Sequence, residues 1–223
     1  MKATFLAHRV QPPTSPRAAS HPTVIMLHGR GADENDLLGL APYLDDRLLI
    51  LSVRAPYPFQ YGGGFAWYDM EQVGTPEPTM FKSSYDKLIT FVNDAVQQYP
   101  VDPERLFLFG FSMGTVMSYA LALSRPALFR GVAANSGYVP EGTHLTYLWD
   151  QLSGVGFSIT HGIHDPVIPV AFARRARDLF ARSNAQVTYK EYPMGHQISE
   201  ESLNDVARWL TQRIDQTREP GHA

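Results

Sequence analysis

The segment GFSMG (110–114) places a single serine, Ser112, between two glycines and fits the pattern G-x-S-x-G. The apolar run over 105–110 predicts a strand, and the apolar spacing over 113–123 predicts a helix directly after the serine. In a turn of this kind the serine has a strained backbone, and its hydroxyl stands at the positive end of the following helix. We therefore predict that Ser112 is a nucleophile in acyl transfer; the alternative is a plain strand-to-helix turn.

A serine nucleophile needs a general base, and the base needs a carboxylate that orients it. Asp165 follows the predicted strand 156–162, and His196 follows the predicted strand 186–192. In open parallel sheets, ligand sites lie at the carboxyl ends of the strands, which is where both residues fall. The order Ser, Asp, His along the chain is also one that serine hydrolases use. We predict His196 as the base and Asp165 as its orienting acid.

Other histidines and acids are weaker candidates because of their positions. Two histidines lie beside Asp165 in the sequence, so neither easily serves as the opposing base, and a third lies in a poorly patterned segment. One rival acid ends a short helical stretch, and the other lies inside a predicted strand. The residues set aside on these grounds are His161, His164, His144, Asp150 and Glu191.

A glycine-rich turn, LHGRGAD (27–33), follows the first buried strand. A turn of this kind can aim a backbone N–H at the oxyanion of a tetrahedral intermediate, and the residue after the nucleophile supplies a second N–H. We therefore predict an oxyanion hole from the N–H groups of Arg30 and Met113; the alternative is a turn that only reverses the chain. His28 precedes the nucleophile in the sequence, so we expect it to hold the turn by hydrogen bonds rather than act as the base.

The composition excludes several classes of function. A net charge of −3 gives no electrostatic footprint for nucleic acid, and without cysteine the chain has no disulfide, thiolate metal site or cysteine nucleophile. No apolar run approaches the length of a membrane span, and the N-terminus lacks the apolar core of a signal peptide. These features predict a cytoplasmic protein. The 223 residues, 44% of them hydrophobic, predict one domain over 1–215 and a disordered tail over 216–223.

Short apolar runs alternate with longer helical patterns along the whole chain. This alternation predicts an α/β fold, with a mostly parallel central sheet and helices on both faces. We expect Ser83 or Ser84 to cap a helix over 85–99, and Ser199 with Ser202 to cap the last helix. The segment 54–80 is rich in proline, glycine and aromatic residues and is longer than an ordinary connection, which indicates a functional loop.

Four motifs, LHGRGAD, GFSMG, HGIHDPVIP and YPMGHQIS, together resemble the phospholipase/carboxylesterase family of small α/β-hydrolases. The resemblance runs from about Val24 to about Leu210, and the chain is too short for a large cap domain. It implies a triad of Ser112, His196 and Asp165 and no metal or organic cofactor. Bacterial carboxylesterases, lysophospholipases and acyl-protein thioesterases belong to this family.

The resemblance also implies a substrate pocket. The segment GGGFAWYDM is similar to the family's loop before the long helix, so we expect Phe65, Trp67, Tyr68 and Met113 to line the pocket. Two residues depart from the family pattern. Many members have Gln where this chain has Met113, and a small apolar residue often stands where it has Arg30. The Arg30 guanidinium either reaches an acidic substrate group or points to solvent.

The predicted function is a serine carboxylesterase that acts on small-molecule esters with short to medium acyl chains. The alternative is a lysophospholipase or acyl-protein thioesterase that acts on long chains. A non-catalytic binding module on the same fold, a peptidase and a dienelactone hydrolase fit less well. The sequence leaves open whether the chain forms a homodimer.

Overall fold

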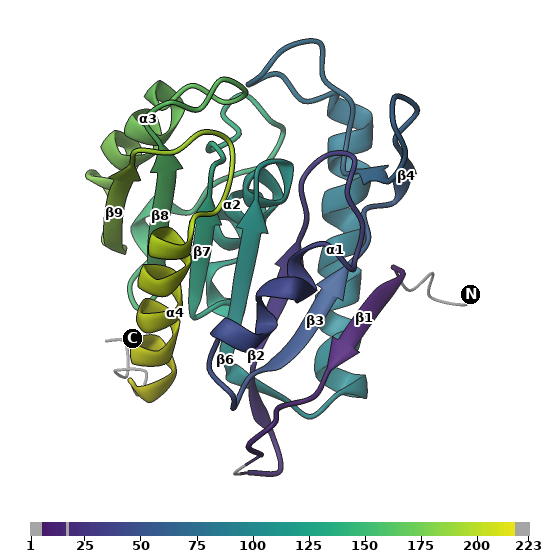
Figure 1. Cartoon of the computed structure of the whole chain (residues 1–223), viewed down its shortest axis with the longest axis vertical. Coiled ribbons are helices and arrows are strands. Elements are labelled where there is room, and N and C mark those ends of the chain that lie inside the picture. The colour runs from purple at the N-terminus through teal and green to yellow at the C-terminus, as the bar shows by residue number, and fades with distance from the viewer. Residues whose placement is uncertain (1–5, 17, 217–223) are drawn as a thin grey trace.

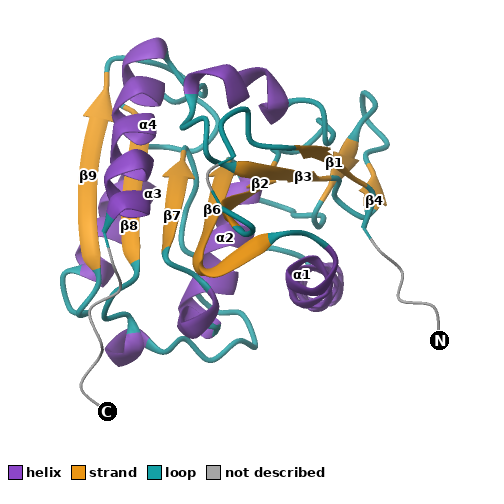
Figure 2. Cartoon of the chain, turned by 90° about the horizontal axis from the view of Figure 1, so that it is seen from below, coloured by secondary structure: helices purple, strands orange, loops and turns teal. Residues whose placement is uncertain are grey.

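A seven-stranded sheet runs through the computed structural model, which describes residues 6–16 and 18–216 (Figure 1). Its strand order is β1-β3-β2-β6-β7-β8-β9, and β1 pairs antiparallel to β3 while the other neighbours pair parallel. The strands are β1 (His8–Gln11), β2 (His21–Leu27), β3 (Leu49–Val53), β6 (Val101–Phe111), β7 (Gly131–Asn135), β8 (Gly156–Gly162) and β9 (Gln186–Tyr192). Figure 2 shows how strongly the sheet twists from β9 to β1.

Helices cover both faces of this sheet, as the sequence pattern predicts. In Figure 1, α4 and the 3₁₀ helix η1 lie in front of the sheet, and α1 and α2 lie behind it. The helices are α1 (Pro78–Gln98), α2 (Met113–Ser124), α3 (Ala171–Phe180) and α4 (Glu200–Asp215), with the 3₁₀ helices η1 (Leu37–Tyr43), η2 (Pro126–Leu128) and η3 (Trp149–Gln151). No helix in the described residues is long and apolar enough to cross a membrane.

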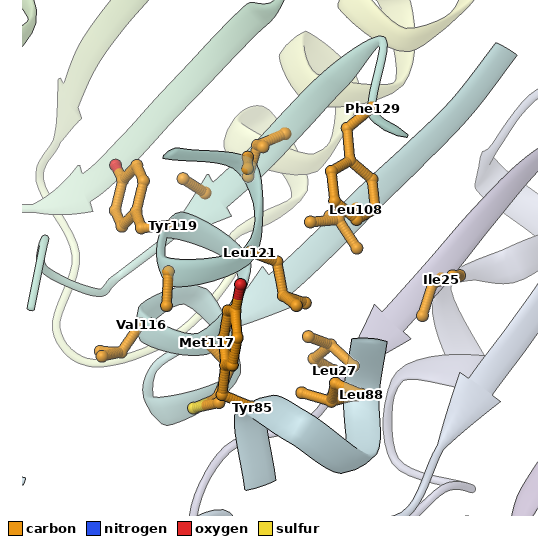
Figure 3. Close-up of a cluster of buried hydrophobic side chains, with 14 of the residues drawn as sticks. Ile25, Leu27, Tyr85, Leu88, Leu108, Val116, Met117, Tyr119, Leu121 and Phe129 are labelled. Carbon is orange, nitrogen blue, oxygen red and sulfur yellow. The ribbon is translucent and has the colours of Figure 1, made fainter. Parts of the chain in front are cut away.

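The larger core lies between the sheet and the helices α1, α2 and α3 (Figure 3). Every residue of α2 is buried, which accounts for a sequence that is apolar on all sides. Leu27 of β2, Leu88 of α1 and Leu121 of α2 meet in this core. The smaller core joins the opposite face of the sheet to η1 and α4. The helix that follows Ser112 is therefore fixed on all sides.

The N-terminal cap predicted for α4 is confirmed, and the cap predicted for α1 is wrong. Ser199 caps α4, and it forms a reciprocal capping box with Ser202 as predicted. The prediction for α1 was wrong, because this helix begins at Pro78 and its cap is Glu77, whose carboxylate accepts from two backbone N–H groups. Ser84 lies inside the helix, and its hydroxyl donates to the Trp67 carbonyl.

The chain between β3 and α1 is ordered but has little regular structure. It contains the two-stranded antiparallel sheet of β4 (Tyr57–Pro58) and β5 (Phe65–Ala66), and a single bridge joins Ala32 to Phe65. This segment therefore packs against the turn that follows β2. The segment TFLAHRV (4–10) predicts an opening strand; it falls partly outside the described residues, and β1 begins at His8. The predicted tail, apart from Gln216, also lies outside them.

Candidate active site

Ser112 lies at the turn between β6 and α2 with a backbone that few L-residues adopt. Its φ is 54° and its ψ is −118°, a left-handed conformation that costs free energy for a residue with a Cβ. The turn is held by its neighbours, because Ser112 N donates to the Asn135 carbonyl at 3.0 Å and the Thr115 hydroxyl donates to the same oxygen at 2.7 Å. The end of β7 thus fixes the serine at the carboxyl edge of the sheet.

The two glycines of the motif are required by crowding rather than by their own φ angles. A Cβ at Gly114 would lie 1.8 Å from the Leu27 carbonyl oxygen, and a Cβ at Gly110 would lie 2.5 Å from the Thr115 backbone. Both distances are far shorter than any non-bonded contact. The sharp turn at Ser112 is therefore compatible only with glycine at both positions.

Hydrogen bonds join Ser112, His196 and Asp165 in a chain. The Ser112 Oγ lies 2.9 Å from His196 Nε2, and His196 Nδ1 lies 2.7 Å from Asp165 Oδ2. Because a carboxylate oxygen accepts, Nδ1–H donates to Asp165, which leaves Nε2 to accept from the serine hydroxyl. The structure thus brings together the three residues that the sequence singled out. This arrangement can remove a proton from Ser112.

The Asp165 carboxylate is buried in a turn after β8, where backbone groups hold its second oxygen. The N–H groups of Val167 and Ile168 both donate to Oδ1 at 2.8 Å. On the other side, the Phe111 ring packs against the His196 ring with 5.0 Å between their centroids. The imidazole therefore has a defined orientation between an aromatic ring and an oriented carboxylate.

The two residues predicted to form an oxyanion hole, Arg30 and Met113, both line the same cavity as Ser112. Within the described residues, neither the Arg30 N–H nor the Met113 N–H is committed to another hydrogen bond. Met113 is the first residue of α2, so its N–H also lies at the positive end of the helix. The Arg30 side chain is exposed, and its guanidinium lies over the Phe59 ring rather than in an ion pair. Neither N–H group therefore has a competing acceptor among the described residues.

The His28 ring stabilises the turn that carries Arg30, as expected. Its Nδ1–H donates to the Gly29 carbonyl at 2.7 Å, and its Nε2 accepts from the Ala55 N–H at 3.0 Å. This arrangement requires a neutral imidazole, and burial lowers the pKa of His28 accordingly. A second restraint is the two-point ion pair between Arg54 and the buried Glu34.

Two of the residues predicted for the pocket, Trp67 and Phe65, do not line it. Trp67 is fully buried beneath the turn, where its indole N–H donates to the His28 carbonyl at 2.9 Å. Phe65 pairs with the turn through its backbone, accepting from Gly31 N and donating to the Ala32 carbonyl. Both residues support the turn that holds Arg30, because this part of the loop packs against that turn instead of lining the pocket.

The cavity at Ser112 has a volume of about 350 Å³, and Tyr68 and Met113 border it as predicted. Most of its other lining residues, apolar and polar, were not predicted from the sequence. The sequence contained some indication of them. Residues 70–73 belong to the loop that the sequence indicates as functional, and Phe111 lies between Gly110 and Ser112 in the G-x-S-x-G motif. The missed residues are Met70, Glu71, Gln72, Val73, Phe111, Tyr138, Val167 and Ile168.

Two tyrosines form one wall of the cavity. Their hydroxyls lie 3.3 Å apart, joining Tyr68 to Tyr138. Phe81 packs behind Tyr68 and Phe172 behind Tyr138, with ring centroids 5.3 and 5.4 Å apart. Burial raises the pKa of both tyrosines, so the wall carries neutral hydroxyls. The packed rings behind it make this wall rigid.

The residues set aside by the sequence reasoning stay apart from the Ser112 hydroxyl. Glu191 forms a two-point ion pair with Arg174 at 2.8 Å, which lowers the pKa of Glu191 to about 2. Asp150 and His164 are exposed. His161 is fully buried, and its Nε2 lies 3.4 Å from Asp165 Oδ2.

Comparisons with known proteins agree with this geometry. The family model for phospholipase/carboxylesterase matches residues 9–214. Acyl-protein thioesterase 1 of Candida albicans is 26% identical over 86% of this chain and 92% of its own. A probable carboxylesterase, SOBER1-like, of Arabidopsis thaliana is 25% identical over 71% of this chain and 63% of its own.

Solved structures with the same fold include two bacterial carboxylesterases. The Bacillus cereus carboxylesterase superposes with a TM-score of 0.82 at 24% identity, covering 94% of this chain and 95% of the other. The Mesorhizobium loti carboxylesterase superposes with a TM-score of 0.79 at 22% identity, covering 92% and 93%. The structural likeness concerns the fold, and the family model covers nearly the whole chain. The chain therefore belongs to the phospholipase/carboxylesterase family of α/β-hydrolases, which are serine hydrolases.

Proposed function

We propose that the protein is a serine carboxylesterase whose nucleophile, base and orienting acid are Ser112, His196 and Asp165. The observation that carries the proposal is the hydrogen-bonded chain from Ser112 Oγ through His196 to Asp165. It stands beside two uncommitted backbone N–H groups in one cavity. The serine attacks, the imidazole moves the proton, and the N–H groups stabilise the oxyanion.

In the acylation step, Ser112 Oγ forms a bond to the ester carbonyl carbon while its proton passes to His196 Nε2. The carbonyl oxygen becomes an oxyanion, and it accepts from the N–H groups of Arg30 and Met113. Asp165 holds the imidazole in place and stabilises the imidazolium. When the tetrahedral intermediate collapses, the carbon–oxygen bond to the alcohol breaks, and His196 returns the proton to the leaving alcohol.

In the deacylation step, water replaces the alcohol as the attacking group. His196 Nε2 takes a proton from the water as its oxygen bonds to the acyl carbon, and the same N–H groups hold the second oxyanion. The bond to Ser112 Oγ then breaks, and the proton returns to the serine. The products are a carboxylic acid and the free enzyme.

Labelling with a fluorophosphonate tests this assignment, because the reagent phosphonylates an activated serine. We expect stoichiometric labelling, with the added mass located on Ser112 by peptide mass spectrometry. The labelled protein is expected to lose all esterase activity. A non-catalytic binding module would stay unlabelled, and labelling at another serine would contradict the assignment.

The cavity walls support a preference for short to medium acyl chains. The pair of Tyr68 and Tyr138 is backed by packed aromatic rings, so the cavity cannot easily lengthen on that side. Thioester hydrolysis uses the same steps, and the relatives named acyl-protein thioesterase 1 favour including it. The alternative, a lysophospholipase or acyl-protein thioesterase, requires room for a long chain.

Chain-length profiling separates these two preferences. We expect p-nitrophenyl butyrate to give a higher kcat/KM than p-nitrophenyl palmitate, and the corresponding thioesters to follow the same order. Tyr138→Ala is expected to shift the optimum toward longer chains because it removes part of the wall. Tyr138→Phe keeps the ring and is expected to leave the optimum in place. A wild-type optimum at palmitate would contradict the short-chain preference.

Three further features of the protein remain predictions from the sequence. The small-molecule ester substrate belongs to the proposed activity. The single domain over 1–215 and the cytoplasmic location are proposed from the composition. A homodimer is left open, and size-exclusion chromatography with light scattering would decide it.

A further inference from the structure

His161 is a buried histidine of β8 that the proposed mechanism does not use. Its side chain is fully buried, and its Nε2 lies 2.7 Å from the Ile168 carbonyl oxygen. Because a carbonyl oxygen only accepts, Nε2 must carry the hydrogen. The ring therefore joins the end of β8 to the far side of the turn that contains Asp165.

The same nitrogen lies close to the Asp165 carboxylate. The distance from His161 Nε2 to Asp165 Oδ2 is 3.4 Å, and Oδ2 is the oxygen that accepts from His196. Ile168, whose carbonyl accepts from His161, also donates its own N–H to Asp165 Oδ1. One imidazole N–H thus faces the acceptor oxygen of the triad and holds the residue that fixes the other oxygen.

We propose that His161 is a positioning residue for the hydrolytic reaction, which holds the Asp165 carboxylate toward His196. It acts by closing the turn over 163–168 and by placing an N–H dipole beside Oδ2. This inference rests on the proposed function, because it assigns to His161 the orientation of the proposed acid. His161 itself touches neither the substrate nor Ser112.

The surroundings of His161 keep it neutral, which this role requires. Burial is the main cause that lowers the pKa of His161, and no described residue hydrogen bonds to its Nδ1. The titratable groups that face it are Asp165, His196 and Glu191, and Glu191 is paired with Arg174. A charged His161 would attract the Asp165 carboxylate in competition with His196. A neutral ring orients the carboxylate without that competition.

Substitution of His161 tests the role with a matched pair of variants. His161→Phe keeps a ring but removes the donor, and His161→Gln keeps an N–H at a similar reach. We expect His161→Phe to lower kcat for p-nitrophenyl butyrate by about 10- to 100-fold with KM unchanged, because small misplacements of catalytic groups have costs of this order. His161→Gln is expected to recover most of kcat. His164→Gln, an exposed neighbour, is expected to leave both constants unchanged.

A double-mutant cycle with Asp165→Asn shows whether the effect passes through the carboxylate. If His161 acts through Asp165, His161→Phe is expected to lower kcat little further in the Asp165→Asn background, because coupled residues are not additive. A full multiplicative loss in that background would overturn the proposal. So would an unchanged kcat in His161→Phe. Since the proposed function is tested separately by labelling of Ser112, failure of one is distinguishable from failure of the other.

Nitrogen-15 NMR of the wild-type protein tests the geometry behind the proposal without any variant, so a contrary result overturns the proposal even where His161→Phe fails to fold. We expect His161 to carry its hydrogen on Nε2 and to have a pKa below the ordinary value of histidine, because burial disfavours its charged form. A hydrogen on Nδ1, or a titration near the ordinary pKa of histidine, would overturn the proposal.

Discussion

Replacing Ser112 with alanine is expected to lower kcat for p-nitrophenyl butyrate by about four to six orders of magnitude, with an unchanged free energy of unfolding or a small increase. The loss is large because the serine forms the covalent intermediate, and removal of a nucleophile in a triad has costs of this size. We expect the fold to be unchanged because the substitution removes the hydroxyl and adds no atom to the crowded turn. The measurement is a steady-state assay with urea unfolding of the same preparations.

Ser118→Ala is the matched control for this substitution. Ser118 lies in the same helix, α2, and its hydroxyl donates to the Gly114 carbonyl at 2.9 Å. We expect its kcat to stay within about twofold of the wild type, since a buried hydroxyl bonded within a helix contributes about 1 kcal/mol to stability and nothing to the chemistry. Residual activity of Ser112→Ala near that of the control would exclude Ser112 as the nucleophile.

Gly114→Ala is expected to destabilise the protein by at least about 3 kcal/mol, because the added Cβ has no room and the buried backbone must move. The Leu27 carbonyl would lie 1.8 Å from that atom in the unchanged structure. Urea unfolding monitored by tryptophan fluorescence gives the free energy of unfolding for both proteins. We also expect the esterase activity to fall, because the shift occurs at the turn that carries Ser112.

The control is Gly39→Ala in η1, where an added Cβ would meet no atom within 4 Å. We expect a change of less than about 0.5 kcal/mol, as for most surface substitutions. Equal stabilities of the Gly114 and Gly39 variants would show that the turn at Ser112 tolerates a side chain. Crowding would then not be the reason for glycine in the G-x-S-x-G motif of this chain.

The strands and the three residues proposed to be catalytic could be predicted from the sequence because both have local sequence patterns. The buried strand over 156–162 was predicted with its observed bounds, since a short run with aromatic and β-branched residues, bounded by turns, is typical of a strand. Parallel strands end at one edge of a sheet, so residues that follow separate strands could be expected to meet. Ser112, Asp165 and His196 do meet there, and capping by Ser199 followed from the same kind of local pattern.

The sequence did not predict which way the side chains of irregular loops point. Trp67 and Tyr68 are neighbours in the sequence, but one lies under the turn of His28 and the other borders the cavity. A strand or helix would fix which of two neighbours faces inward, and a loop has no such periodicity. The prediction of the α1 cap was wrong because Glu77 is an uncommon capping residue. Serine is a common one, so Ser83 or Ser84 was predicted instead.

The two sides of the cavity are subject to different constraints on change. Val167 and Ile168 line it, and their N–H groups also hold the Asp165 carboxylate, so a change in this wall alters shape and reactivity together. Residues 70–73 form a second part of the lining and are held locally, since Met70 bridges to Pro76 and Thr75 donates to the Gln72 carbonyl. Substitutions at residues 70–73 can therefore change the substrate preference while the hydrogen bonds among Ser112, His196 and Asp165 stay as they are.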